Sequence, residues 1–174
     1  EILYRLVGSE MCIRDRKPIG LVRLGSDGDE INIELPRLDM DEVTIELDGR
    51  LDESIWVSIP GYDNMLVMDP DTLEKTRFKT DARMFYTGEG LYVGVFMEQP
   101  SETLIARLSS RDEFINRDSI GITIDTSGEG LYGYWFTLNL GGSVMDGKVA
   151  PERQFSREWD GPVSYTHLRA HETV

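Results

Sequence analysis

Between residues 17 and 162 this chain of 174 residues carries no histidine and no cysteine. The one cysteine, Cys12, and the two histidines, His167 and His171, lie in the end segments. The middle segment therefore lacks the side chains for Cys–His or Ser–His–Asp nucleophilic catalysis and for histidine-ligated metal or haem. Carboxylates, arginines, hydroxyls and aromatic rings remain as its reactive or binding groups.

Two kinds of carboxylate chemistry follow from this composition. Paired carboxylates can hydrolyse glycosides, but no motif marks two of the many acidic residues as facing one another, so we assign no catalytic residue and expect no enzyme. Asp39-Met40-Asp41 and Asp69-Pro70-Asp71 offer the oxygen ligands that calcium prefers. Neither continues into a D-x-D-x-D-G loop. Structural calcium is left open, with no metal ligand assigned and no cofactor expected.

The composition is strongly acidic. Lysine and arginine total 18 against 32 aspartates and glutamates, giving a net charge of -14. Nucleic-acid binding relies on basic groups that displace counterions, and anionic lipid surfaces attract basic segments. We therefore expect no nucleic-acid partner. No apolar run approaches the ~20 residues of a spanning helix, so we expect no direct membrane insertion of this segment.

Apolar and polar residues alternate with period two in several segments, which are residues 31–35, 43–47, 91–97, 120–124 and 134–139. Such alternation in branched and aromatic residues is typical of strands that bury one face. Turn-forming runs rich in glycine separate these segments, and strands joined by short turns form antiparallel sheets. The pattern predicts an all-β fold, an antiparallel two-sheet β-sandwich of jelly-roll or immunoglobulin-like type.

One segment, residues 51–57, reads as a helix of about two turns at most, with Asp52 placed to cap it. Trp56 in this helix is expected to fill the core rather than to present a ligand platform. The preceding Asp48-Gly49 is a turn pair that tolerates positive φ.

The two ends are expected to lie outside the domain. Residues 1–16 and 163–174 resemble translated sequencing-adapter strings, and each end is electrically neutral. The net charge of -14 therefore belongs to residues 17–162, which form the expected domain. The apolar run in residues 2–7 is too short for a signal-peptide core, so no signal peptide is expected in this fragment.

Residues 45–56, IELDGRLDESIW, resemble the "IDG-x-LDE-x-x-W" opening of the family-nine carbohydrate-binding modules. Later strings match that family in the same order: Thr80-Asp81-Ala82-Arg83, Leu91 to Val95, Arg111-Asp112, Asp118 to Thr126, Phe136 to Asn139, Asp146-Gly147 and Trp159-Asp160. The similarity spans about residues 43–162 and lacks the family's closing strands, so we expect a C-terminally truncated domain. The resemblance implies a β-sandwich that binds a glycan without catalysis.

The resemblance also implies a setting. The family branch that this chain resembles most forms the N-terminal part of large bacterial proteins whose remainder is a predicted outer-membrane β-barrel. The expected location is therefore periplasmic, outer-membrane-associated or extracellular, and the expected partners are a glycan and other domains of the same parent chain, including a β-barrel.

The family's sugar-holding residues are not reproduced here. In the founding modules two tryptophans hold a sugar end, with a glutamate and an arginine on adjacent strands. In this sequence the position of the family's first tryptophan falls near Phe114 or Ile115. Gly121 stands at the position of the family's glutamate, and Thr137 stands at the position of its arginine.

Alternation nevertheless predicts one solvent-facing surface that carries an aromatic ring. If segments 120–124 and 134–139 are neighbours, Trp135 would stand over the small Gly121 and leave a shelf for a sugar, with Arg111 at its rim. The predicted glycan-binding residues on and around this shelf are Trp135, Phe114, Arg111, Thr137 and Asn139. The alternative is a structural or interaction domain that precedes a β-barrel and binds no sugar.

Overall fold

The computed structural model describes residues 2–7, 21–23, 30–32, 34–39, 41, 44–68, 71–113, 115–161 and 163–165. The candidate ligand residue Phe114 lies outside the described residues. Met40, Asp69 and Pro70 of the acidic segments considered for calcium also lie outside them.

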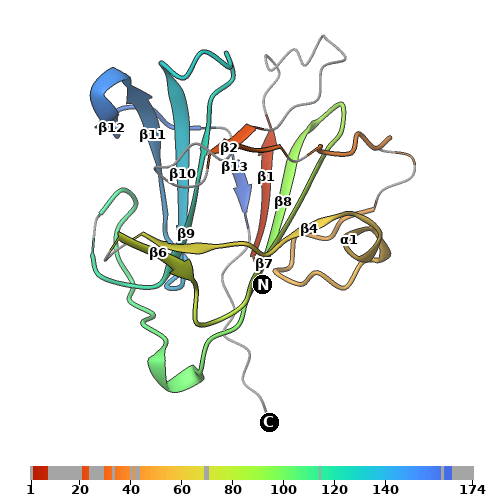
Figure 1. The fold of residues 1–174 in the computed structure, drawn as a ribbon, viewed down its shortest axis with the longest axis horizontal. Coiled ribbons are helices and arrows are strands. Elements are labelled where there is room, and N and C mark those ends of the chain that lie inside the picture. Colours follow the sequence, from red (N-terminus) through yellow and green to blue (C-terminus); the bar gives the residue numbers. More distant parts are fainter. Residues whose placement is uncertain are drawn as a thin grey trace.

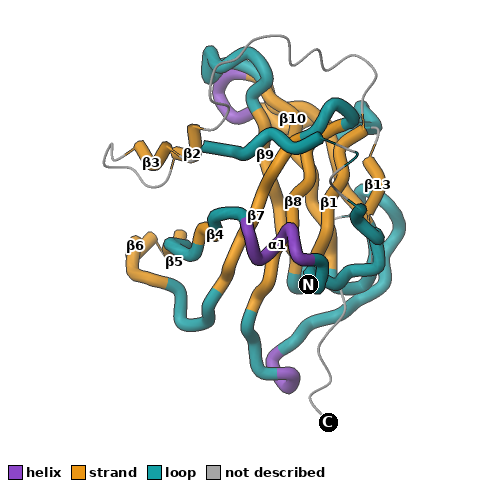
Figure 2. Tube along the Cα trace, turned by 90° about the vertical axis from the view of Figure 1, so that its right-hand side faces the viewer, coloured by secondary structure: helices purple, strands orange, loops and turns teal. Residues whose placement is uncertain are grey.

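The described chain consists mainly of antiparallel strands, which confirms the all-β prediction (Figure 1). One sheet has five strands in the order β13 (Val163–Tyr165), β1 (Ile2–Val7), β8 (Gly90–Met97), β7 (Thr80–Tyr86) and β4 (Gly61–Tyr62). A second sheet has four strands in the order β12 (Gln154–Ser156), β11 (Val144–Ala150), β10 (Gly133–Asn139) and β9 (Ser119–Ile124). Two hairpins, β2 (Leu21–Arg23) with β3 (Glu30–Asn32) and β5 (Leu66–Met68) with β6 (Asp71–Lys75), extend from one side of these sheets (Figure 2). The helical elements are α1 (Ser54–Ser58) and the 3₁₀ turns η1 (Ser101–Thr103) and η2 (Pro151–Arg153).

The two larger sheets bury one face of each against the other. Ala82 of β7 and Val93 and Val95 of β8 form one buried cluster with Leu138 of β10 and Val144 of β11. Side chains from both inner faces thus make a common core, which is the arrangement of a β-sandwich. The predicted sandwich is therefore confirmed.

The outer face of the five-stranded sheet is covered by the segment that resembles the family-nine opening. Phe85 of β7 and Tyr92 of β8 stack with ring centroids 4.7 Å apart, and Trp56 of α1, 1% exposed, packs on Phe85 at 5.2 Å. A Cβ added to Gly94 would lie 2.7 Å from Leu51 Cδ2, so the glycine lets this segment approach the sheet. Trp56 fills a core, as expected from the sequence.

Helix α1 differs from its prediction at the start. Its N-cap residue is Glu53 rather than Asp52, and no side chain caps the helix. The Glu53 carboxylate instead accepts hydrogen bonds from Trp56 Nε1 at 3.0 Å and from the Glu46 amide at 2.9 Å. None of the described helices is long and apolar enough to cross a membrane.

Residues 44–47, predicted as part of a strand, belong to no strand in the structure. Ile45 and Leu47 nevertheless pack against the cluster around Trp56. The alternation arises because this extended segment packs every second side chain against the sheet, although its backbone does not pair with a strand.

Residues 2–7, from the end segment expected to lie outside the domain, form β1 between β8 and β13. This pairing uses backbone N–H and C=O groups, which any extended segment can offer to a sheet edge. The domain bounds of 17–162 and the truncation stay predictions.

Candidate functional site

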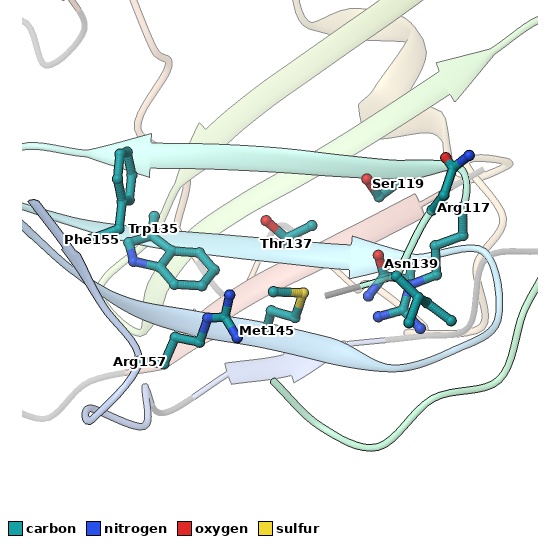
Figure 3. A pocket seen from close by; sticks show the side chains of 10 residues that line it. Arg117, Ser119, Trp135, Thr137, Asn139, Met145, Phe155 and Arg157 are labelled. Atoms are coloured by element: carbon teal, nitrogen blue, oxygen red, sulfur yellow. The ribbon is translucent and has the colours of Figure 1, made fainter. Parts of the chain in front are cut away.

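A groove of about 510 Å³ lies on the outer face of the four-stranded sheet (Figure 3). On β10 the side chains of Trp135, Thr137 and Asn139 line this groove, and they alternate with Phe136 and Leu138, which are buried. The alternation in the sequence therefore placed the three predicted ligand residues of this strand on one face, as expected.

The register of the strands differs from the predicted shelf. β10 pairs with β9, so the two segments are neighbours, but Trp135 lies opposite Thr123, and Gly121 lies opposite Thr137. On its other side Trp135 lies opposite Gly147 of β11, where an added Cβ would be 2.9 Å from the indole Nε1. The small residue beneath the tryptophan is Gly147, because alternation fixes the face of a residue but not its partner across the ladder.

Trp135 and Phe155 form the aromatic end of the groove. Their rings meet edge to face, with centroids 6.2 Å apart and planes at 72°. Trp135 is only 9% exposed, whereas Phe155, from β12, is 62% exposed. Phe155 is therefore the ring that a ligand reaches most readily.

Arg157 lies beside the aromatic rings (Figure 3). Its Nη1 donates to the backbone oxygen of Asp112 at 3.0 Å, which connects the side chain to the loop before β9. Sequence reasoning identified neither Phe155 nor Arg157. Phe155 lies on β12, a strand of three residues that is too short to show alternation, and Arg157 follows directly after the end of that strand.

Arg117 lies at the opposite end of the groove and is only 8% exposed. Its Nη1 donates to the Arg107 carbonyl at 3.3 Å and to the Ser109 hydroxyl, and its Nη2 donates to the Glu113 carbonyl at 2.9 Å. Its Nε has no hydrogen-bond partner among the described residues. Sequence reasoning missed this residue because it sits in a loop outside any periodic segment.

Hydroxyl and amide groups lie between the two ends. Ser119 is exposed and Thr137 is half-buried, so both hydroxyls face the groove from neighbouring strands. Asn139 is buried, and its Nδ2 donates to the Ser143 carbonyl at 3.0 Å. Asn139 therefore shapes the β10–β11 turn, and its amide N–H is already engaged.

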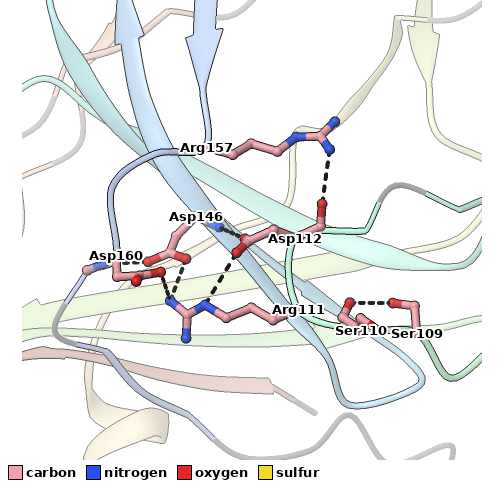
Figure 4. A network of polar contacts seen from close by, with 8 residues as sticks. Ser109, Ser110, Arg111, Asp112, Asp146, Arg157 and Asp160 are labelled. Atoms are coloured by element: carbon pink, nitrogen blue, oxygen red, sulfur yellow. Dashed lines mark hydrogen bonds and ion pairs between the residues drawn. The ribbon is translucent and has the colours of Figure 1, made fainter.

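Arg111, predicted at the rim of the shelf, is not among the residues that line the groove. Its Nη2 donates to Asp146 at 2.7 Å and contacts Asp160 at 2.9 Å, and its Nε lies 3.5 Å from Asp112 (Figure 4). Burial alone would lower the pKa of Arg111, but the Asp146, Asp160 and Asp112 carboxylates raise it above its ordinary value. We name these four residues the Arg111 network.

The three aspartates of the Arg111 network have carboxylate oxygens within 4.8 Å of one another, a spacing that could hold a cation. The Arg111 guanidinium already supplies positive charge at this cluster. Asp146 is fully buried and also accepts a hydrogen bond from the Gly161 amide. The cluster is therefore accounted for by ion pairs within the chain.

The structure brings Trp135, Thr137 and Asn139 together in one groove and adds Arg117, Phe155 and Arg157 to it. The groove offers aromatic faces, hydroxyls and two guanidinium groups. Comparison of the chain with protein-family models, with curated proteins and with solved structures finds no match in any of the three.

Proposed function

We propose that this chain is a non-catalytic carbohydrate-binding domain whose groove holds a short oligosaccharide. The observation that carries the proposal is the pairing of the exposed Phe155 ring and Trp135 with hydroxyl and guanidinium groups in one groove. Aromatic faces pack against the C–H patches of sugar rings, and polar groups fix the orientation of the hydroxyls.

The dimensions of the groove fit a ligand of this kind. Trp135 and Asn139 lie about 13 Å apart along β10, at about 3.3 Å per residue. The volume of about 510 Å³ falls within the range of about 300–1,000 Å³ that is usual for small-molecule sites. An elongated ligand of several rings would fill such a groove, whereas a single ion would not.

The lining supports binding rather than catalysis. Among the described residues that line the groove there is no aspartate, glutamate, histidine or cysteine. Glycoside hydrolysis needs a carboxylic acid on each side of the scissile bond, and these side chains do not supply one. In line with the family resemblance, we place the domain in a longer bacterial extracytoplasmic protein.

The experiment is a glycan-array screen followed by calorimetric titration of the wild type and of Phe155→Ala. Loss of the ring contact is expected to weaken binding about tenfold, since stacking of this kind contributes about 1.5 kcal/mol. Tyr132→Ala is the matched control, because Tyr132 is an aromatic residue of similar exposure (64%) that does not line the groove. The control is expected to bind as the wild type does.

The alternative, a structural or interaction domain without a sugar ligand, makes the opposite prediction. It expects no saturable binding to any neutral, acidic or amino-sugar glycan, and no difference between the Phe155 and Tyr132 variants. That result would contradict the proposed function.

A further inference from the structure

The groove differs in charge from the rest of the chain. The protein has 32 acidic and 18 basic residues and a net charge of -14. The described lining of the groove nevertheless contains two arginines, Arg117 and Arg157, and no carboxylate. A surface with the average composition of this chain would carry more acidic than basic groups, so the lining is selectively basic.

Arg117 is a buried cation without an anionic partner among the described residues. Its guanidinium donates only to neutral oxygens, two carbonyls and one hydroxyl, and its Nε has no partner there. Burying a charge is costly unless an opposite charge is near. Two other partly buried arginines have such partners, since Arg83 lies 3.0 Å from Asp81 and Arg111 lies 2.7 Å from Asp146. Arg117 has no such partner among the described residues, although it is more deeply buried than either of them.

Arg157 places a second positive charge at the aromatic end. It makes no ion pair within the described part of the chain, and its hydrogen bond to the Asp112 carbonyl holds the guanidinium beside the Trp135 ring (Figure 3). A side chain held in this way loses little freedom when a ligand binds. The two guanidinium groups therefore lie at opposite ends of the groove, Arg157 beside the aromatic rings and Arg117 at the other end, with the Thr137 hydroxyl between them (Figure 3).

We infer that the groove selects an acidic glycan, an oligosaccharide whose sugar rings carry carboxylate or sulfate groups that pair with Arg157 and Arg117. This inference rests on the proposed function and adds the chemical class of the ligand. The planar guanidinium matches the two oxygens of a carboxylate or sulfate and binds them more strongly than it binds neutral hydroxyls. A neutral glycan would leave Arg117 without its counter-charge.

The test uses calorimetric titration with three oligosaccharides of equal length: oligogalacturonate, its fully methyl-esterified form, and a sulfated galactan fragment. The ester differs from the acid only in its missing charge. At least one of the two acidic ligands is expected to bind about tenfold or more tightly than the ester. The ligand that binds more tightly identifies carboxylate or sulfate as the recognised group.

Variants connect this preference to the groove. Arg157→Gln is expected to remove most of the preference for the acidic ligand, whereas Phe155→Ala should weaken binding of the acid and of the ester by similar factors. Arg50→Gln is the control, because the Arg50 side chain is 60% exposed on the segment that covers the other sheet. Arg117→Lys, checked for folding by circular dichroism, keeps the positive charge but loses the planar guanidinium. This variant is expected to weaken binding of the acidic ligand more than binding of the ester.

Equal affinity for the acidic and esterified ligands, unchanged by Arg157→Gln, would overturn this inference and leave the proposed function intact. Absence of binding to every glycan would overturn both.

Discussion

Replacing Arg111 by methionine removes the guanidinium that holds three aspartates together. In the structure this group lies 2.7 Å from Asp146, 2.9 Å from Asp160 and 3.5 Å from Asp112. Methionine retains much of the apolar length of the side chain, so Arg111→Met mainly removes the positive charge and its hydrogen bonds.

The expected loss of stability depends on how deeply the Arg111 and Asp146 side chains are buried. Removing one partner of a buried ion pair costs about 3–5 kcal/mol. Asp146 is fully buried, but the Arg111 side chain is 48% exposed, so water can reach the gap. We therefore reduce the expected loss to about 2–3 kcal/mol, or a fall in Tm of roughly 5–10 °C for a domain of this size.

The pKa of Arg111 is raised, so titration of this residue does not alter the comparison near neutral pH. A folded-state pKa above the unfolded one stabilises the protein at every pH below the unfolded value. That contribution is lost only as the pH rises through the folded value, which for arginine lies in strong alkali. The difference in stability between the wild type and Arg111→Met is therefore expected at any pH near neutrality.

Urea denaturation followed by circular dichroism measures the loss. Arg50→Met is the matched control, because Arg50 lies 3.8 Å from Asp48 and both side chains are substantially exposed, at 60% and 35%. An exposed pair of this kind should change stability by less than about 0.5 kcal/mol. If Arg111→Met unfolds at the same urea concentration as Arg50→Met, the reasoning about the Arg111 network is refuted.

Three further predictions concern the rest of the molecule. Calcium at millimolar concentration is expected to raise the Tm of Arg111→Met but not of the wild type, because the variant leaves three carboxylates within 4.8 Å without their cation. Gly94→Ala should lower the free energy of unfolding by about 1–3 kcal/mol through overpacking, because the added Cβ would lie 3.0 Å from the Trp56 ring of α1. Gly88→Ala is the control, because no atom lies within 4 Å of the added Cβ, and this variant should have the Tm of the wild type. Hydrogen bonds from the Ser127 hydroxyl and from turn amides hold the pKa of Asp125 below its ordinary value. Asp125 therefore stabilises the fold above its unfolded pKa and loses this contribution as the pH falls through the folded one. The Tm deficit of Asp125→Asn should narrow in acid, and an equal deficit at pH 7 and pH 3 would contradict the assignment.

The fold and one face of the site could be predicted because period-two alternation reports which side chains share a face of a sheet. It placed Trp135, Thr137 and Asn139 together. It could not give the register, because every second residue satisfies the same pattern. For that reason Gly121 rather than Gly147 was expected beneath the tryptophan.

Other parts of the groove leave no periodic signal. Phe155 lies on a strand of three residues, and Arg117 and Arg157 lie in loops. Their positions depend on loop hydrogen bonds with partners such as the Asp112 carbonyl, 45 residues from Arg157 in the sequence. Such contacts cannot be read from the order of residues alone.

The strings that carry the family resemblance have a structural reading as well. Arg111-Asp112, Asp146-Gly147 and Trp159-Asp160 lie far apart in the sequence but meet in the Arg111 network. Arg111 was predicted as a ligand residue because it was expected at the rim of the shelf beside Trp135. In the structure Arg111 instead forms ion pairs with three aspartates.

The central claim is that a glycan occupies the outer face of the four-stranded sheet. The most direct test is a ¹⁵N-HSQC titration with the oligosaccharide that binds most tightly. A glycan bound in the groove is expected to give the largest chemical-shift changes at the Trp135 indole N–H and at the amides of Thr137, Phe155 and Arg157, with little change at Tyr92 on the other sheet. Largest changes around Tyr92, or an unchanged spectrum at saturating glycan, would contradict it.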